Sequence, residues 1–361
     1  MKRKYSITLI GAGDRGNRYM RMLKEHFEGQ IEYRTVCDII PDRMDKARAE
    51  YGFTQKVSEW EKALATNPSD IAVIAVPAYF HCDMAIFAMT HQSHALIEKP
   101  LDLSVEKCFK LEACQRKTGK AVALGMQYRN IPYFRSVKNA FSAGLFGENP
   151  MIHYQDLRQI RPKIAMHDIL YGNGGPIVDM SCHLFDLMRW YYNSDPAYVS
   201  AFWRINAKGR LDLEEIAPDS CFINVEYENG SLGSIMLNWG LPPGAPDVFY
   251  STVAGSSGIL IPHSIATGNA VKVAVGEKLL NASASLEDAD DLIHPERAVF
   301  MHLIEEIEGT GKSQVSIHEG KLCLAAAMAA LCSCNLRRAV SIEEMLKLQP
   351  TALDCMKAEI K

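Results

Sequence analysis

A glycine-rich turn between an apolar run and a helical pattern constrains the fold of this chain more than any other feature. Residues 7–10 (Ile-Thr-Leu-Ile) lead directly into a G-x-G-x-x-G motif, and apolar residues at helical spacing follow it. In a strand–turn–helix setting, these glycines permit a tight bend and let a pyrophosphate approach the helix N-terminus, where N–H groups favour anions. The motif therefore predicts a dinucleotide site, with cofactor contacts from Gly11, Gly13, Asp14, Arg15 and Gly16.

An aspartate follows the next β-rich stretch. Residues 31–37 end in Asp38, about twenty residues past the last glycine, where a carboxylate can accept hydrogen bonds from an adenosine ribose. A 2′-phosphate beside Asp38 would be repelled, so NAD is predicted in preference to NADP. Arg43, five residues later, leaves NADP open because an arginine can pair with that phosphate.

Strands and helices then alternate up to about residue 126. The run at 71–76 is apolar throughout, which is typical of a parallel strand covered on both faces. We predict a doubly wound α/β (Rossmann) domain at residues 1–126, in which ligands bind at the carboxyl ends of the strands. Six residues follow strand ends and are predicted to contact the cofactor: Asp38, Pro77, His81, Glu98, Lys99 and Gln127.

The pattern changes in the second part of the chain, residues 127–361. Alternating runs at 151–157, 198–205 and 220–227 indicate strands, and Asn229-Gly230 predicts a hairpin turn into 231–239. These signals predict an α+β domain with an open, mainly antiparallel sheet. Further strands are expected at 248–253, 258–261 and 271–275, a loop at 282–291, and helices at 295–308, 319–337 and 341–347. These C-terminal helices are counted with the second domain, and they could pack back on the first.

Bulk properties exclude several classes of protein. A net charge of −4 over 361 residues gives neither the basic surface that nucleic acid requires nor a polybasic membrane patch. The basic start is followed by an apolar run that glycine and charge soon interrupt, so we expect no leader or spanning segment there. The ten cysteines have no disulfide-framework spacing and predict buried thiols in a reducing cytoplasm. Cys332-Ser333-Cys334 lacks a second pair of ligands, so no metal site is predicted.

The stretch from Gly174 to Asp186 is the candidate centre of the chemistry. Pro176 suits the first turn of a helix, here predicted over residues 176–192, in which Asp179, His183 and Asp186 fall on one stripe. A carboxylate one turn before an imidazole can fix its tautomer and stabilise its charged form, as a general acid or base requires. A buried structural histidine with a local ion pair is the alternative interpretation.

These motifs together resemble the glucose–fructose oxidoreductase / inositol dehydrogenase / MocA (Gfo/Idh/MocA) family over nearly the whole chain. The resemblance rests on the glycine motif and Asp38, and then on a series of later motifs. Those motifs are Pro77 with His81, Glu98-Lys99-Pro100, Gln127-Tyr128-Arg129, Gly144-Leu145-Phe146-Gly147-Glu148, and Gly174-Gly175-Pro176 leading to Asp179, His183 and Asp186. Pro176 stands where the family often has a third glycine.

The resemblance implies hydride transfer between a nicotinamide and a secondary alcohol of a sugar, polyol or cyclitol. It gives catalytic roles to Lys99, Asp179 and His183: His183 as the base, Asp179 as its partner, and Lys99 as a donor to the reacting oxygen. Some family members are NAD-requiring glycoside hydrolases that oxidise a ring carbon transiently, and this alternative needs the same residues. A non-catalytic NAD(P)-binding regulator is a third alternative, which the intact catalytic residues disfavour.

A loop at residues 158–173 is the predicted substrate loop. Arg158, Arg161, Lys163 and His167 make this loop basic, which suggests either an anionic substrate group or a solvated loop. The predicted substrate contacts are Arg129, Tyr154, Arg158, His167 and Tyr171. Tyr128, Tyr154, His167 and Tyr171 could also supply the extra acid and base that an elimination requires. The open sheet is predicted to form a homodimer or homotetramer, with no nucleic-acid or membrane partner.

Overall fold

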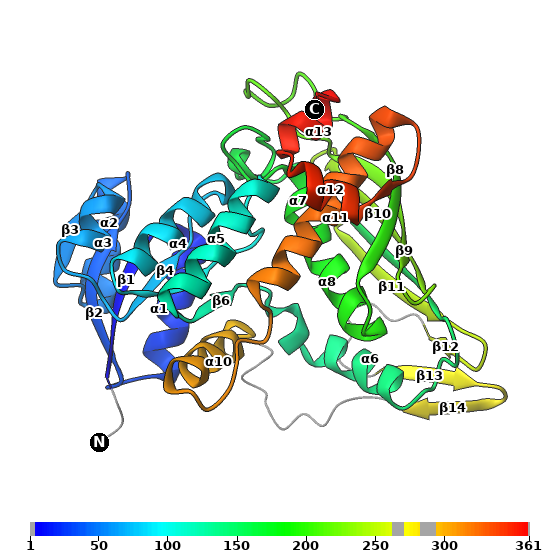
Figure 1. The fold of residues 1–361 in the computed structure, drawn as a ribbon, viewed down its shortest axis with the longest axis horizontal. Helices are drawn as coiled ribbons and strands as arrows, with labels where there is room; N and C mark the ends of the chain where they lie inside the picture. The colour runs from blue at the N-terminus through cyan, green and yellow to red at the C-terminus, as the bar shows by residue number, and fades with distance from the viewer. Residues whose placement is uncertain (1–3, 262–270, 282–293, 360–361) are drawn as a thin grey trace. The chain divides into compact units, whose positions relative to one another are not determined.

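The chain folds into two units, each assembled from segments that are distant in sequence (Figure 1). The computed structural model describes residues 4–261, 271–281 and 294–359, so the loop predicted at 282–291 lies outside the described residues. The N-terminal unit comprises Met1–Asp102, Lys107–Gln127 and Ile293–Gly320. The C-terminal unit comprises Leu103–Glu106, Tyr128–Leu292 and Lys321–Lys361. The sequence analysis draws a single boundary after residue 126, whereas each unit here is discontinuous.

A six-stranded parallel sheet forms the centre of the N-terminal unit, in the order β3-β2-β1-β4-β5-β6. Its strands are β1 (Tyr5–Ile10), β2 (Ile31–Cys37), β3 (Gln55–Val57), β4 (Ile71–Ile74), β5 (His94–Ile97) and β6 (Val122–Leu124). Its helices are α1 (Asp14–His26), α2 (Pro41–Tyr51), α3 (Trp60–Ala65), α4 (His81–Thr90), most of α5 (Val105–Thr118) and α10 (Glu296–Glu308). The strand order reverses at β1 and β4, where a doubly wound sheet binds its ligand. The predicted Rossmann fold is confirmed.

Helix α10 belongs to the N-terminal unit although it comes late in the chain. Val299, Phe300 and Leu303 are buried in the same apolar cluster as Leu96 of β5 and Ala123 of β6. The Phe300 ring also meets Phe27, just past the end of α1, with ring centroids 5.0 Å apart. Burial of apolar side chains is the dominant favourable term in folding, so α10 is an integral part of this core.

A nine-stranded mixed sheet forms the C-terminal unit, in the order β14-β13-β12-β11-β7-β10-β9-β8-β15. Its strands are β7 (Met151–Gln159), β8 (Pro196–Arg204), β9 (Ser220–Tyr227), β10 (Leu232–Leu241), β11 (Val248–Ala254), β12 (Ile259–Leu260), β13 (Lys272–Val275), β14 (Lys278–Asn281) and β15 (Val340–Ser341). Its helices are α6 (Pro132–Ser142), α7 (Gly175–Asp179), α8 (Ser181–Tyr192), most of α11 (Ile317–Leu336), α12 (Ile342–Leu348) and α13 (Ala352–Lys357). All described pairings are antiparallel except that of β7 with β10. The predicted mainly antiparallel sheet is confirmed.

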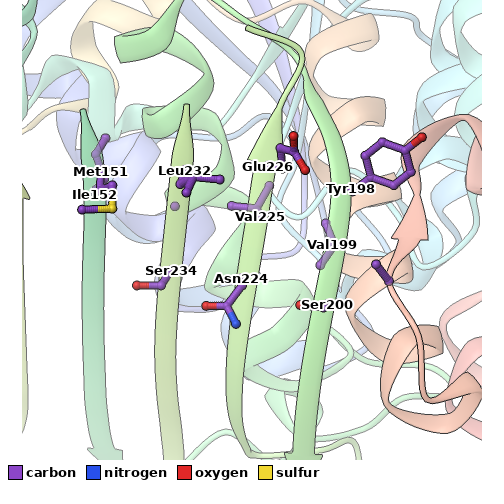
Figure 2. A pocket seen from close by; sticks show the side chains of 12 residues that line it. Met151, Ile152, Tyr198, Val199, Ser200, Asn224, Val225, Glu226, Leu232 and Ser234 are labelled. Atoms are coloured by element: carbon purple, nitrogen blue, oxygen red, sulfur yellow. The ribbon is translucent and has the colours of Figure 1, made fainter. Parts of the chain in front are cut away.

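Alternate residues of this sheet are buried, as the sequence pattern requires. On β9, Cys221, Ile223 and Val225 are buried, whereas Phe222 and Glu226 face outward. Figure 2 shows a hollow across β7, β10, β9 and β8, whose lining includes the exposed side chains of Met151, Tyr198 and Leu232. One face of the sheet therefore belongs to the core and the other is exposed on this chain.

The prediction of one continuous helix over residues 176–192 is wrong in one respect. The stretch is two segments, α7 and α8, separated at Met180. The backbone N–H of His183 donates to the Met180 carbonyl at 3.2 Å, and the Ser181 hydroxyl bonds the Ile177 carbonyl. A serine hydroxyl that competes for a carbonyl one turn earlier disturbs a helix at this point. The i, i+4 spacing of Asp179 and His183 is consequently not that of one continuous helix.

Helix α11 is long and apolar enough to cross a membrane, judged by length and composition alone. In the structure, 89% of the most apolar 18-residue stretch of this helix is buried inside the protein. A core helix that is apolar on all sides has the same composition.

Candidate functional site

The glycine-rich turn of the N-terminal unit connects β1 to α1 within three residues. Gly11 has a φ of +90°, and a Cβ there would lie 2.4 Å from the Ala75 carbonyl oxygen. A Cβ on Gly16 would lie 2.0 Å from the Gly11 carbonyl oxygen. Gly13 is different: it is the N-cap of α1, and the nearest atom to its virtual Cβ is 3.8 Å away. Two glycines therefore allow the turn to form, and the third leaves space at a helix N-terminus that suits a phosphate group.

Asp38 lies beside this turn at the end of β2. Its Oδ2 accepts a hydrogen bond from the Ala12 N–H at 2.7 Å, and its Oδ1 accepts one from the Ile40 N–H at 2.9 Å. Each carboxylate oxygen has a further lone pair that can accept from a ribose hydroxyl. Arg43 is half-exposed with its Nη1 3.8 Å from Oδ1, the place where a 2′-phosphate would find a counter-charge. The residues present therefore fit an adenine dinucleotide.

Arg15 and Glu98, two of the predicted cofactor contacts, bind each other. Arg15 Nε donates to Glu98 Oε1 at 2.9 Å, and the Tyr19 hydroxyl donates to the same oxygen at 2.6 Å. Burial alone would raise the pKa of Glu98, but the Arg15 guanidinium and these hydrogen bonds outweigh it and hold the pKa below its usual range. Arg15 also bonds Glu296 of α10 at 2.9 Å, and Arg18 pairs with the same carboxylate. The sequence analysis missed Glu296, which is 281 positions from Arg15.

Lys99 lies in the turn that follows β5, and it is partly buried. A buried histidine holds this turn: the His81 ring nitrogens lie 2.8 Å from the Pro100 carbonyl oxygen and 2.9 Å from the Val76 carbonyl oxygen. Burial lowers the pKa of His81, so the imidazole is neutral at physiological pH. His81 thus joins the end of β4, where Pro77 follows, to the segment that carries Lys99.

Gln127 is nearly buried at the end of this unit. In the orientation that satisfies its amide, its nitrogen donates to the Gly125 carbonyl and its oxygen accepts from Arg15 Nη2 at 3.0 Å. Asp14 begins α1, so its carboxylate lies at the positive end of the helix dipole. The predicted cofactor residues Arg15, Glu98 and Gln127 are therefore linked through Arg15, and Asp38 is bonded to the glycine-rich turn.

In the C-terminal unit, two glycines form the entry to α7. Gly174 and Gly175 both have positive φ, 75° and 69°, and a Cβ on Gly175 would lie 2.7 Å from the Ala217 side chain. Pro176 occupies the first turn of α7, as predicted. The loop therefore enters the helix at a sharp, glycine-dependent bend that places Asp179 at the end of α7.

His183 is 2% exposed, and its ring is stacked flat on Tyr128. The two ring centroids are 4.0 Å apart with an interplanar angle of 1°. Asp179 is 1% exposed and its Oδ1 accepts a hydrogen bond from Asn173 Nδ2 at 3.0 Å. Stacking thus fixes the plane of the imidazole, and Asn173, which the sequence analysis missed, fixes the carboxylate.

Asp186 forms a buried ion pair. Arg129 donates to it through Nε at 2.9 Å and Nη2 at 2.5 Å, and neither side chain is more than 5% exposed. Because Arg129 is adjacent to Tyr128, this pair holds the 127–130 turn against α8 and supports the Tyr128–His183 stack. Arg129, a predicted substrate contact, thus has its guanidinium bonded to Asp186.

The other predicted substrate residues lie in different environments. Tyr154 is 2% exposed and His167 is fully buried, with its Nε2 accepting from the Arg161 N–H at 3.0 Å. Arg158 makes a two-point pair with Asp156, 2.7 Å at each contact. Tyr171 is 56% exposed. Among these residues, Tyr171 and the partly exposed Arg158 have side-chain surface available for a ligand.

Comparison with known proteins identifies both parts of the chain. A family model described as "Oxidoreductase family, NAD-binding Rossmann fold" matches residues 5–126, and the "GFO/IDH/MocA C-terminal domain" model matches residues 134–261. A glycosyl hydrolase family 109 protein from Shewanella woodyi is 32% identical over 159 residues, which is 41% of this chain and 32% of that protein. An inositol 2-dehydrogenase/D-chiro-inositol 3-dehydrogenase from Lactiplantibacillus plantarum is 22% identical over 198 residues, 54% of this chain and 55% of that protein.

These matches span about a third and about half of the length of the two curated relatives. An oxidoreductase from Agrobacterium radiobacter, solved with NAD+, L-tartaric acid and magnesium, has a similar fold with a TM-score of 0.78. It is 18% identical and the similarity covers 95% of this chain and 99% of that one. The chain therefore belongs to the Gfo/Idh/MocA oxidoreductase family, with the NAD-binding Rossmann fold that its motifs predict.

Proposed function

We propose that this protein is an NAD-dependent oxidoreductase that transfers a hydride between nicotinamide and a secondary alcohol of a sugar, polyol or cyclitol. The main support is the space over Gly13 at the N-terminus of α1, with Asp38 fixed beside it by the Ala12 N–H. Membership of an NAD-binding oxidoreductase family agrees with this assignment. The ten free cysteines, nine of them buried, suit a reducing compartment such as the cytoplasm.

His183, Asp179 and Lys99 would perform the chemistry. When NAD is bound, its nicotinamide accepts the hydride. His183 would remove the hydroxyl proton, with its ring plane held by Tyr128. Asp179, anchored by Asn173, would balance the charge that the imidazole gains. Lys99 would donate a hydrogen bond to the alcohol oxygen and stabilise its developing negative charge.

The cofactor preference can be tested by titrating NADH and NADPH separately. We expect NADH to bind more tightly, because Asp38 accepts ribose hydroxyls and repels a phosphate. Arg43→Gln should weaken NADPH binding more than NADH binding, since Arg43 Nη1 lies 3.8 Å from Asp38 Oδ1, where it can pair with a 2′-phosphate. Tighter binding of NADPH by the unmodified protein would contradict the assignment.

A glycoside hydrolase is the second candidate, and the family 109 relative favours it. A dehydrogenase releases NADH in proportion to product, whereas a redox-neutral hydrolase returns the hydride and keeps its cofactor. The decisive experiment offers neutral polyols, sugars, sugar acids, sugar phosphates and aryl glycosides, and scores NADH formation and bond cleavage in parallel. We expect stoichiometric NADH from a polyol or sugar. Aryl glycoside cleavage with catalytic NAD and no NADH would establish the alternative.

We also propose that a second copy of the chain covers the outward face of the C-terminal sheet. Phe202 and Phe222 are each 60% exposed and are directly paired on β8 and β9, with Met236 next in register on β10. A polar row lies beside them, with Ser200, Asn224 and Ser234 in register (Figure 2). Light scattering should show a dimer or tetramer, and Phe222→Glu should dissociate it. A monomer at micromolar concentration would remove this proposal.

A further inference from the structure

Three potential metal ligands meet in the N-terminal unit, two from the end of α1 and one from late in the chain. Glu25 and His26 are the last two residues of α1, and His294 comes just before α10. One ligand atom from each residue, a ring nitrogen or a carboxylate oxygen, lies within 4.8 Å of the others. The sequence motifs do not point to this cluster, because 269 positions separate Glu25 from His294.

The apolar core of the N-terminal unit supports the elements that carry this cluster. The same two helices are joined through the Phe27–Phe300 ring contact and the shared apolar cluster. The His294 side chain is 9% exposed, and its Nε2 lies 2.7 Å from Glu25 Oε2. The rings of His26 and His294 lie edge to face, 5.3 Å between centroids. The His294 imidazole is therefore held by burial, and the partly buried His26 ring lies against it, so two of the three ligands have restricted positions, as a preorganised site requires.

The bonding of His294 is incomplete within the described part of the chain. Its Nδ1 is buried and has no hydrogen-bond partner among residues 4–261, 271–281 and 294–359. The contact between Nε2 and Glu25 accounts for one of the two ring nitrogens only. Because each residue offers a single ligand atom, an ion bound through Nε2 leaves Nδ1 to another partner.

Two imidazoles and one carboxylate are a donor set that Zn²⁺ favours at sites with an open fourth position. A tetrahedral ion bound at about 2.0–2.1 Å separates its ligand atoms by roughly 3.3 Å. Glu25 Oε2 would have to withdraw slightly from His294, which its half-exposed side chain allows, and ligand atoms that lie as far as 4.8 Å apart would have to move closer. One carboxylate and two neutral imidazoles carry a charge of −1, which attracts a divalent cation.

We propose that Glu25, His26 and His294 bind a divalent transition-metal ion, for which Zn²⁺ is the probe, and that the ion ties the end of α1 to the start of α10. The site is independent of the proposed catalytic residues. An ion that binds the folded protein alone raises its stability by mass action. Zn²⁺ should therefore stabilise the protein without being needed for hydride transfer.

The test uses full-length protein without a polyhistidine tag, stripped with a chelator and titrated with Zn²⁺ by calorimetry. We expect one ion per chain. Glu25→Gln, His26→Gln and His294→Gln should each weaken binding by at least about tenfold, the loss that even an outer partner of a metal ligand causes. His318→Gln is the matched control, because that exposed histidine on α11 pairs with Glu112 and lies outside the cluster.

Thermal unfolding gives a second readout that does not depend on activity. Zn²⁺ should raise the melting temperature of the parent protein and of His318→Gln, and at the same concentration raise that of the three ligand variants less. Glu25→Gln changes a half-exposed side chain, so it should fold even if His294→Gln does not. Equal Zn²⁺ affinity in the parent protein and Glu25→Gln, or no binding at all, would overturn the proposal.

Discussion

The glycine-rich turn of the N-terminal unit and the α7–α8 segment of the C-terminal unit provide binding groups in different ways. At the turn, the groups are backbone N–H donors, and their positions depend on which residues lack a Cβ. At α7–α8 the groups are side chains, His183 and Asp179, held by Tyr128 and Asn173. A backbone site is encoded by local sequence, whereas a side-chain site depends on packing between distant segments. Substitutions should therefore separate cofactor binding from turnover.

The largest effect should come from His183→Ala. Loss of a general base lowers turnover by about 10²–10⁴-fold, because the hydroxyl proton then has no positioned acceptor. NADH affinity should stay within a factor of two or so of the parent value, since His183 lies in the other unit from the glycine turn. Steady-state kinetics and fluorescence titration measure the two quantities. Equal losses of stability and activity would instead identify a structural histidine.

Asp186→Asn should have the largest effect on stability. It leaves the Arg129 guanidinium buried without its counter-charge, which costs about 3–5 kcal/mol of unfolding free energy. The exposed pair of Arg338 with Glu344 is the control: Glu344→Gln should cost less than about 1 kcal/mol. Urea denaturation measures both. A small cost for Asp186→Asn would show that the 127–130 turn is held by other contacts.

Gly13→Ala should affect the cofactor and spare the fold. Gly13 has an ordinary φ of −73° and no atom crowds its virtual Cβ, so alanine fits, but its methyl group occupies the phosphate approach. We expect about tenfold weaker NADH binding, equivalent to about 1.4 kcal/mol. Gly29→Ala, at a φ of +73° with open space, is the matched control and should cost stability without changing NADH affinity. Unchanged NADH binding in Gly13→Ala would mean that the phosphates bind elsewhere.

The smallest effect concerns pH. Burial lowers the pKa of His81 in the N-terminal unit and of His153 and His167 in the C-terminal unit. A lowered pKa means that the unfolded chain binds more protons, so stability is complete above the ordinary histidine pKa of about 6.5 and falls as the pH drops below it. The melting temperature should be lower at pH 5.5 than at pH 7.5. His81→Asn should reduce this difference, and a higher melting temperature at pH 5.5 would contradict the argument.

Local signals in the sequence predict most of the Rossmann unit. The apolar strand β4 and the glycine turn depend on short-range geometry, and both are confirmed. The small strand β14 was missed because all four of its residues are exposed, so it shows no alternation. The break at Met180 was missed because the helical pattern continues through it.

The candidate site is less predictable than the fold that carries it. Arg129 and Asp186 are 57 positions apart, and nothing in either segment indicates that they pair. The sequence motifs give Asn173 no role, although it holds Asp179. Sequence spacing thus predicts which residue types are available, while their partners depend on how distant segments meet. The roles proposed for Lys99, Asp179 and His183 remain predictions that the substitutions above can test.

The late position of α10 in the chain has a consequence for synthesis on the ribosome. Phe300 and Leu303 complete the apolar cluster around β5 and β6, yet they are translated only after strands β7 to β14 of the C-terminal unit. At about 5–20 residues per second, the ribosome needs roughly ten to thirty seconds to travel from the end of the parallel sheet to α10. During that interval the nascent N-terminal unit has apolar surface uncovered. The two units therefore cannot mature strictly one after the other, and the emerging chain must stay protected until its last third is made.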